Sequence, residues 1–276
     1  MSLHIYEELD QGTPEWLAAR AGIVTASVVG NLISKGAPDA LTVDCPKCLA
    51  LPAESCISTA RKVPTPIKTP HDERVAKASH LPPVYGVAST DTARAIISTL
   101  VAERITGFVE QIYPSRDMER GTLSEPYARD IYAENYAPES VSQVGFMVRE
   151  FDGYRIGYSP DGLVGDDGLI EIKSPRQKKH LATILAGEVP AEHMAQCQTG
   201  LLVSGRKWID FISYNGGMPL WHKRVAPDEE WFTAIKQVAA AYEETAATMI
   251  ANYKTATSGL PETERIDFFP EMEITF

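Results

Sequence analysis

The chain has 276 residues, with 26 lysines and arginines against 37 aspartates and glutamates, so its formal net charge at pH 7 is −11. A polybasic nucleic-acid binder draws a positive field from its composition, and this acidic balance argues against that class without excluding an enzyme that has a local basic groove. Hydrophobic residues make up 44% and charged residues 23%. This composition supports a buried core and excludes an intrinsically disordered chain.

Signals for export or membrane insertion are missing from the sequence. No run approaches the roughly 18 consecutive apolar residues that a spanning helix needs. Glu7, Glu8 and Asp10 stand where a signal peptide would carry basic residues and then an apolar core. We therefore expect a cytoplasmic protein with no membrane contact.

The N-terminal region predicts two short helices. Thr13 and Pro14 are typical of an N-cap and a first helical position, and this helix should end near Gly22. A second helix is predicted from Thr25, and Ser27 makes its first turn rich in hydroxyl groups.

Residues 37–83 differ in character from the rest of the chain. Their prolines break any helical or strand period, and they stand at positions 38, 46, 52, 64, 66, 70, 82 and 83. We interpret this stretch as an inserted segment, organised by metal or flexible, within a single domain that spans residues 1–276.

Three cysteines and a histidine in this segment form a candidate zinc site. Cys45, Cys48, Cys56 and His71 give a Cys₃His set whose first pair has zinc-knuckle spacing, with His80 as a competing fourth ligand. Structural Zn²⁺ is the favoured interpretation because metal binding can supply folding free energy that burial cannot. The alternatives are a redox pair or simple buried thiols. The pattern is similar to small zinc-binding motifs in proteins of actinobacterial phages.

A cluster of basic residues suggests a role for the segment. We hypothesise that it is a zinc-pinned arm that contacts DNA or a partner, since five basic residues accompany the cysteines: Arg61, Lys62, Lys68, Arg74 and Lys77.

The second half of the chain alternates between strand and helix signals. After helices predicted from Thr90 to Gly107 and over residues 123–136, turn signals divide residues 143–173 into strands that we expect to form an antiparallel meander. A helix from Pro190 to about Val203, strands at 208–214 and 221–225, and a helix from Pro227 should follow. The order predicts an α/β fold with a mixed sheet.

Two carboxylates and a lysine should converge in this region. Glu171 and Lys173 are two apart on a strand and therefore share a face, and the turn at residues 166–168 folds Asp161 back beside Glu171. Carboxylates this close are costly unless a cation lies between them, and Mg²⁺ or Mn²⁺ is the cation that oxygen ligands prefer. The alternative is an aspartate in a turn beside a solvent-facing Glu/Lys pair.

These residues match a known family. Asp161…Glu171-Ile172-Lys173 resembles the active-site signature of the PD-(D/E)xK nucleases. Three further stretches, in the same order, are similar to motifs of the phage lambda exonuclease and YqaJ-like viral recombinase family: WLAARAGIVTAS at 16–27, GTLSEPYA at 121–128 and AQCQ at 195–198. The resemblance implies a restriction-endonuclease-like core in which helices flank a central mixed β-sheet.

The resemblance also implies an activity, a Mg²⁺-dependent or Mn²⁺-dependent 5′→3′ exonuclease acting on double-stranded DNA ends. Asp161, Glu171 and the Ile172 carbonyl would hold the metal, Glu125 would support a second ion, and Lys173 would orient and activate the attacking water. Gln196 would position water or the carboxylates.

Four residues match family positions that grip a terminal 5′-phosphate, or lie beside them: Arg20, Thr25, Ser27 and Ser159. A hydroxyl-rich helix N-terminus and an arginine are a chemically suitable anion site. The alternatives are a surface salt bridge for Arg20 and a plain helix start for Ser27.

Other functions and partners stay open from the sequence. The scaffold could serve a catalytically idle DNA-end-binding or assembly protein, an endonuclease or a nickase. The family resemblance further implies a phage or prophage protein in a bacterial host, a single-strand annealing protein as partner, and a homo-oligomer such as a ring trimer.

The net charge is unevenly distributed. From residue 227 onward there are ten acidic against three basic residues, whereas a basic run follows the candidate catalytic strand and comprises Lys173, Arg176, Lys178, Lys179 and His180. We expect an acidic C-terminal face directed away from DNA and a phosphate path along the basic run.

Overall fold

A computed structural model of the chain describes residues 2–58, 63–110, 114–137 and 140–266. Its helices are α1 Pro14–Arg20, α2 Ala26–Leu32, α3 Asp72–Ala78, α4 Asp91–Thr106, α5 Arg116–Tyr136, α6 Gln177–Ala186, α7 Ala191–Ser204 and α8 Glu229–Ala256, with a 3₁₀ turn at Ala40–Thr42. Its strands are β1 Ser2–Tyr6, β2 Val24–Thr25, β3 Ile33–Gly36, β4 Val84–Val87, β5 Val141–Ser142, β6 Phe146–Glu150, β7 Arg155–Tyr158, β8 Gly162–Val164, β9 Gly168–Lys173, β10 Trp208–Ser213 and β11 Trp221–Val225.

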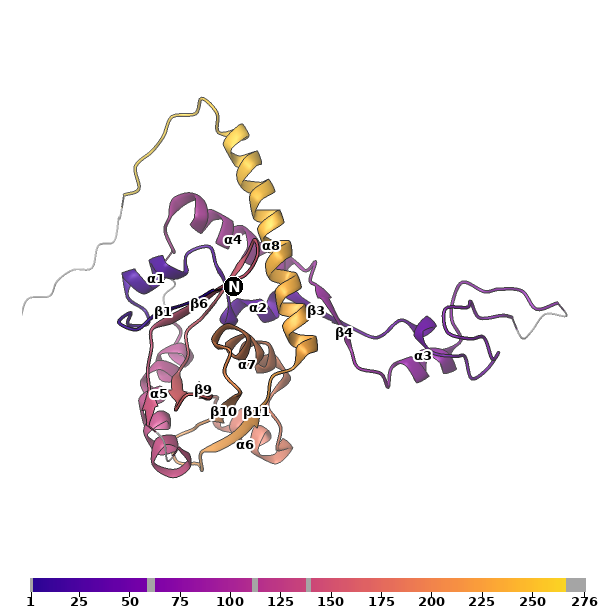
Figure 1. Ribbon diagram of the computed structural model, residues 1–276, viewed down its shortest axis with the longest axis horizontal. Coiled ribbons are helices and arrows are strands. Elements are labelled where there is room, and N and C mark those ends of the chain that lie inside the picture. Colours follow the sequence, from indigo (N-terminus) through magenta and orange to yellow (C-terminus); the bar gives the residue numbers. More distant parts are fainter. Residues whose placement is uncertain (1, 59–62, 111–113, 138–139, 267–276) are drawn as a thin grey trace, which may run out of the picture.

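The body is built on two sheets flanked by helices (Figure 1). One sheet has the order β1-β6-β7-β2 and the other the order β11-β10-β9-β8-β5. The second sheet is mixed, because β9 pairs parallel with β10 and antiparallel with β8. The prediction of an α/β fold with a mixed sheet is therefore confirmed.

The predicted meander across residues 143–173 is wrong. β6 and β7 form one hairpin in the first sheet, and β8 and β9 form another in the second sheet. The chain crosses between the sheets over Ser159, Pro160 and Asp161, where proline cannot continue a ladder. Asp161 consequently lies at the junction of the two sheets.

Helix α7 is the buried centre of the body. It contacts β6 and β7 of one sheet and β9 and β10 of the other, with α2 and α8 packed against it. Gly200 faces the ring of Tyr158, where a β-carbon would come within 2.8 Å of the ring. The missing side chain thus lets Tyr158 lie between α7 and the second sheet.

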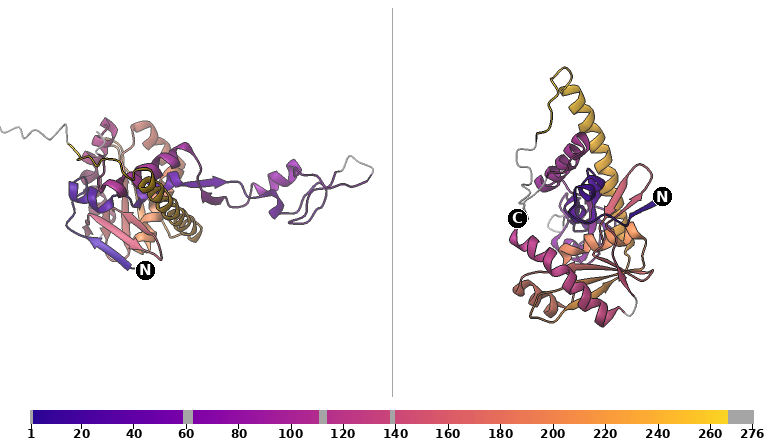
Figure 2. Two further views of the ribbon diagram at one scale, coloured as in Figure 1. Left: turned by 90° about the horizontal axis from the view of Figure 1, so that it is seen from above. Right: turned by 90° about the vertical axis from the view of Figure 1, so that its left-hand side faces the viewer.

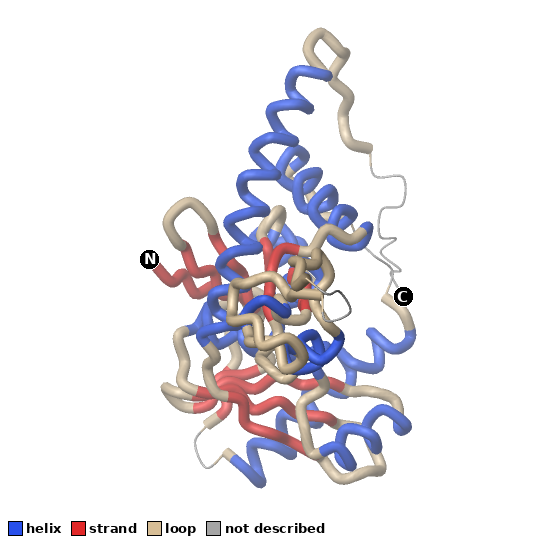
Figure 3. The backbone as a smooth tube through the Cα atoms, turned by 90° about the vertical axis from the view of Figure 1, so that its right-hand side faces the viewer, coloured by secondary structure: helices blue, strands red, loops and turns tan. Residues whose placement is uncertain are grey.

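Residues 37–58 and 63–83 form an arm that projects from the body (Figures 1 and 2). β3 and β4 pair antiparallel at its base, from Ile33↔Val87 to Gly36↔Val84. The ribbon packs on α8, with the rings of Tyr85 and Trp231 4.5 Å apart. Figure 3 shows the arm end-on, in front of the body.

Three helices depart from the sequence expectations. α3 lies within the proline-rich segment, in the proline-free stretch between Pro70 and Pro82, where no helix was expected. α5 begins at Arg116 rather than near residue 123, because Ser115 caps it and its packing on the sheet overrides Gly121 and Pro126. α6 was not predicted, since the basic residues after β9 give no clear apolar period.

None of the helices in the described part of the chain is both long and apolar enough to cross a membrane.

Candidate active site and zinc cluster

The Glu171 carboxylate is the most enclosed charge of the candidate active site. It is fully buried on β9, where Oε1 accepts a hydrogen bond from Lys173 Nζ at 2.6 Å and Oε2 accepts one from the Tyr158 hydroxyl at 3.3 Å. Asp161 lies beside it, with Oδ2 accepting from the Ile172 backbone N–H at 2.6 Å. The predicted convergence of Asp161, Glu171 and Lys173 is therefore present.

Burial and mutual repulsion perturb this group electrostatically. Desolvation and the Glu171 charge raise the pKa of Asp161 well above its usual range. Burial alone would lower the pKa of Lys173, but the charges of Glu171 and Asp161 outweigh it and raise that pKa. The site therefore keeps a protonated lysine and carries carboxylates whose joint ionisation is costly without a cation.

Glu125 lies near the pair but faces another partner. Its carboxylate forms an ion pair with Arg129 one turn later on α5, and Arg129 Nε donates to the Asp161 carbonyl at 2.8 Å. Desolvation raises the pKa of Glu125, and the Glu171 charge adds to the rise. The oxygens of Glu125, Asp161 and Glu171 do not come within 4.8 Å of one another as a set. Glu125 would have to leave Arg129 to share a metal with the other two.

One face of α7 borders the same site. Gln196 is half-buried there, one turn after His193, whose ring stacks on Phe211 at 5.2 Å. Phe211 is the β10 partner of Glu171. Burial, and then the Lys173 charge, lower the pKa of His193 to about 4. Cys197 is a fully buried core residue, as predicted.

The four predicted phosphate ligands form one connected cluster. Arg20 Nη2 donates to Thr25 Oγ1 at 3.3 Å and to Ser27 Oγ at 3.2 Å, and the two hydroxyls are 2.9 Å apart. The Arg20 guanidinium lies 4.2 Å from the Trp16 ring centre, and Trp16 Nε1 donates to Ser159 Oγ at 2.9 Å. The hydroxyls of Thr25 and Ser27 therefore meet the Arg20 guanidinium directly, and Trp16 links this group to the Ser159 hydroxyl in the inter-sheet crossing.

The cysteine cluster of the arm has the geometry of a zinc site. One ligand atom from each of Cys45, Cys48, Cys56 and His71 lies within 4.8 Å of the others, whereas His80 is exposed outside the cluster. Burial would raise the pKa of Cys48, but backbone N–H groups, foremost that of Ile57, lower it to about 7. A thiolate is thus accessible near neutral pH, as a zinc ligand requires.

The basic residues of the arm are more constrained than predicted. Arg74 is fully buried and donates to three backbone carbonyls, those of Val43, Leu51 and Glu54. Lys77 pairs with Asp44 at 2.6 Å. Arg74 is therefore a structural residue rather than a DNA contact. Lys68 is exposed, and Arg61 and Lys62 lie outside the described residues.

The predicted basic run after β9 is also smaller than expected. His180 is fully buried, with ring nitrogens 2.8 Å from Ser213 Oγ and 3.0 Å from the Pro219 carbonyl. Arg176 is paired with Asp117, while Lys178 is exposed on α6. Only part of the run can therefore meet a phosphate backbone.

Sequence reasoning missed several neighbours of the site. Tyr158 ends β7 and directly precedes Ser159, Pro160 and Asp161. Its closeness to Asp161 in the sequence was the signal that could have placed it at the site. Arg129 was one helical turn beyond Glu125, a spacing typical of an ion pair. His193 gave no signal on its own, because only the pairing of β9 with β10 brings Phe211 and α7 to the carboxylates.

The fold and the site define a nuclease with a restriction-endonuclease-like α/β fold. Residues 71–207, just under half of the chain, match the model of the YqaJ-like viral recombinase domain, the family that the chain resembles. Residues 12–90 match a model described as "Putative DNA-binding phage zinc finger domain". Together the two matches cover the arm and most of the body.

Solved structures agree with this assignment. The alkaline exonuclease LHK-Exo from Laribacter hongkongensis is 27% identical, with a TM-score of 0.64 over 90% of this chain and 100% of that chain. A structure of LHK-Exo in complex with dAMP gives 28% identity and a TM-score of 0.63 over the same shares. No curated protein shows significant similarity to the chain.

The choice of zinc ligands can be tested by substitution. His71→Ala should lose most of the bound zinc, because the site keeps only three ligands, whereas His80→Ala should retain it. Metal content per chain of the purified variants measures the difference. Equal zinc loss in both variants would contradict the Cys₃His assignment.

The His193 environment predicts a defined acid response. Its folded pKa of about 4 lies below the unfolded value of 6.5, so the neutral ring contributes stability above pH 6.5 that is lost as the pH falls toward 4. His193→Phe keeps the ring stacking on Phe211. It should make the fall of the unfolding free energy with pH in this window shallower, by the slope that corresponds to up to about one bound proton. Urea unfolding at several pH values measures the slope, and an unchanged slope would show that His193 is not buried in this way.

Proposed function

We propose that the chain is a divalent-metal-dependent 5′→3′ exonuclease that removes nucleotides from the ends of double-stranded DNA. One observation carries the proposal. Ser159, of the phosphate-binding cluster, and Asp161, of the carboxylate cluster, are two residues apart in the crossing between the sheets. Two residues span at most about 7 Å, which corresponds to one or two nucleotides at roughly 3.4 Å of rise each.

This spacing favours removal of nucleotides from an end. A terminal 5′-phosphate held by Arg20, Thr25, Ser27 and Ser159 would place an adjacent phosphodiester near Asp161 and Glu171. Burial lowers the pKa of Arg20 from its ordinary value, yet an arginine remains charged and can grip phosphate through two N–H groups. An internal site on closed DNA offers no terminal phosphate to this cluster.

The carboxylate cluster fits a hard metal ion. Its proposed ligands, the side chains of Asp161, Glu171 and Glu125 and the Ile172 carbonyl, are all oxygen donors, which suits Mg²⁺ or Mn²⁺. The raised pKa of Asp161 fits a site that needs a cation to ionise fully. When bound, one or two such ions would polarise the scissile phosphate and lower the pKa of water.

Lys173 and Gln196 supply polar contacts beside the metal ligands. Because its pKa is raised, Lys173 donates hydrogen bonds and stabilises developing negative charge while orienting the attacking water, instead of acting as a general base. Gln196 lies on the α7 face that borders the cluster and would position water there.

The relatives are consistent with this chemistry. LHK-Exo is described as an alkaline exonuclease and has been solved in complex with dAMP. A deoxynucleoside monophosphate is the class of product that stepwise digestion of DNA releases. We further propose that the zinc arm contacts DNA, since its family description names DNA binding and Lys68 is exposed on it. An annealing-protein partner and a homo-oligomer stay predictions.

Replacing Asp161 should separate activity from stability. Asp161→Asn should reduce cleavage of linear duplex in Mg²⁺ by roughly 1000-fold, as expected for loss of a metal ligand. It should also raise the melting temperature of the metal-free protein by a few degrees, on the order of 1 kcal/mol, because the repulsion with Glu171 disappears.

Asp166→Asn, in the exposed turn before β9, is the matched control and should change neither quantity. Retained activity in Asp161→Asn would contradict the assigned site, and absence of cleavage in the wild type with any divalent ion would favour an idle scaffold.

The phosphate cluster predicts a preference at the DNA end. The wild type should degrade 5′-phosphorylated duplex at least about tenfold faster than 5′-hydroxyl duplex, and Arg20→Ala should remove most of that difference by lowering the faster rate. Release of nucleotides from end-labelled duplexes measures both rates. Cleavage of covalently closed circles would instead indicate an endonuclease.

A further inference from the structure

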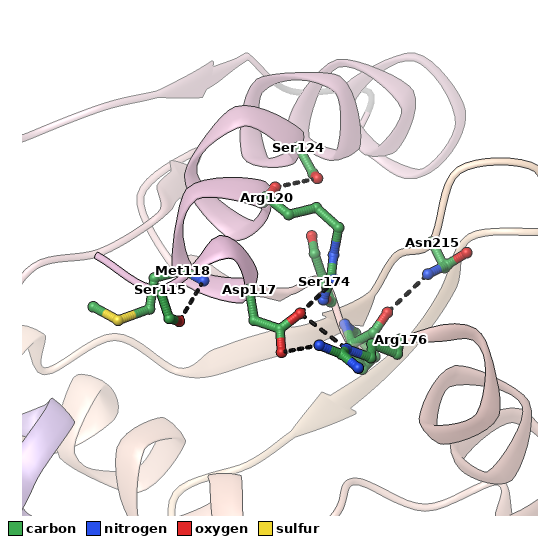
Figure 4. A network of polar contacts seen from close by, with 9 residues as sticks. Ser115, Asp117, Met118, Arg120, Ser124, Ser174, Arg176 and Asn215 are labelled. Atoms are coloured by element: carbon green, nitrogen blue, oxygen red, sulfur yellow. Dashed lines mark hydrogen bonds and ion pairs between the residues drawn. The ribbon is translucent and has the colours of Figure 1, made fainter. Parts of the chain in front are cut away.

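A second arginine cluster lies beside the catalytic strand and includes Arg176, whose pairing with Asp117 was described above (Figure 4). Asp117, in the first turn of α5, accepts hydrogen bonds from Arg120 Nη1 at 2.6 Å and from Arg176 Nε at 3.0 Å. Arg120 Nη2 also donates to the Ser174 carbonyl at 2.9 Å. Asn215 fixes the same loop by donating to the Pro175 carbonyl at 2.8 Å.

The cluster is positively charged and incompletely satisfied. Two guanidiniums share the single carboxylate of Asp117, which leaves a local charge of about +1 at neutral pH. Arg120 Nε and Ser174 Oγ are both buried and have no hydrogen-bond partner among the described residues. Buried polar atoms of this kind are rare because each unmade hydrogen bond is costly. Here two polar groups without partners lie beside an excess positive charge.

The position of the cluster ties it to the active site. Ser174 directly follows Lys173 at the end of β9, and Arg120 lies on α5 five residues before Glu125, about 7.5 Å along the helix axis. The Arg176 side chain is 74% exposed, so its guanidinium is accessible to an approaching polyanion. The cluster is thus one residue beyond Lys173 in the chain and open to solvent at Arg176.

We propose that Arg120, Ser174 and Arg176 form a subsite for a DNA backbone phosphate next to the scissile one, and that Asp117 is the internal counterion that this phosphate displaces. The proposal rests on the proposed DNA-cleaving function. It assigns to Asp117 an effect opposite to that of a purely structural residue. As a competitor for the two arginines, Asp117 weakens DNA binding, whereas in a structural clamp its loss would disorder the loop and weaken binding.

The test measures DNA binding without cleavage. In a Lys173→Ala background, the affinity for a 5′-phosphorylated duplex end is measured by fluorescence anisotropy across about 50 to 200 mM salt. Arg176→Ala should weaken binding roughly tenfold and reduce the slope of log K against log salt by about one, the loss expected for one phosphate contact. Asp117→Asn should strengthen binding severalfold at low salt.

Arg94→Ala is the matched control. Arg94 pairs with Asp91 three residues earlier on α4, as Arg120 does with Asp117 on α5. Because Arg94 lies outside the site, its loss should leave affinity and slope unchanged. Thermal melting of each variant checks that the fold is intact.

A duplex series with one neutral methylphosphonate at successive positions locates the contact. A methylphosphonate at one position near the scissile bond should weaken binding by the Lys173→Ala parent. The same methylphosphonate should not weaken binding further when Arg176→Ala is added to that parent. Equal penalties in both proteins at every position, or weaker binding by Asp117→Asn, would overturn the subsite. Failure of the proposed function has a different signature: the Lys173→Ala parent would not bind DNA ends and the wild type would not cleave them. Failure of the subsite alone would leave both of these activities in place.

Discussion

The fully buried Glu171 carboxylate is the constraint on which the organisation of the body depends. A buried charge is tolerated only when its surroundings supply partners. Lys173 supplies the positive charge from the same strand face, and Tyr158 supplies a hydroxyl from the other sheet, through the space left by Gly200. Residues of both sheets and of α7 therefore have to assemble around one buried carboxylate. The same requirement holds the crossing that carries Asp161 against the end of β9.

Holding Asp161 beside the buried Glu171 lowers the stability of the fold but assembles the groups that the chemistry needs. Asp161 lies beside the buried Glu171, and burial together with the Glu171 charge raises the pKa of Asp161. Strain of this type is typical of functional sites, where local rules are broken and the rest of the fold compensates. Compensation here comes from the apolar residues around α7 and from ion pairs such as Arg104 with Glu243.

The sequence was most informative where chemistry is local. Caps and periodicity located α1, α4, α7 and α8, and the two-residue period of β9 placed Glu171 and Lys173 together. It failed where the outcome depends on distant contacts. The meander was wrong because nothing in the turn signals shows that β7 and β8 join different sheets, and His180 is buried because Ser213 and Pro219 approach it from a later part of the chain. Arg74 resembled a DNA contact in sequence, yet three backbone carbonyls hold it inside the arm.

The two-stranded ribbon at the base of the arm is fixed to the body at one end only. Its inner end is clamped to α8 through Tyr85 and Trp231, and its outer end carries the zinc cluster. Strand residues rise by about 3.3 Å each and alternate faces with a period of two. Adding two residues to each strand would advance the outer end by about 6.6 Å and keep each later side chain on its face of the ribbon, whereas adding one would turn every later side chain to the opposite face. The number of residue pairs in the ribbon therefore sets how far the zinc cluster lies from the body, and related chains can change this distance only in steps of two residues per strand if the side chains are to keep their faces.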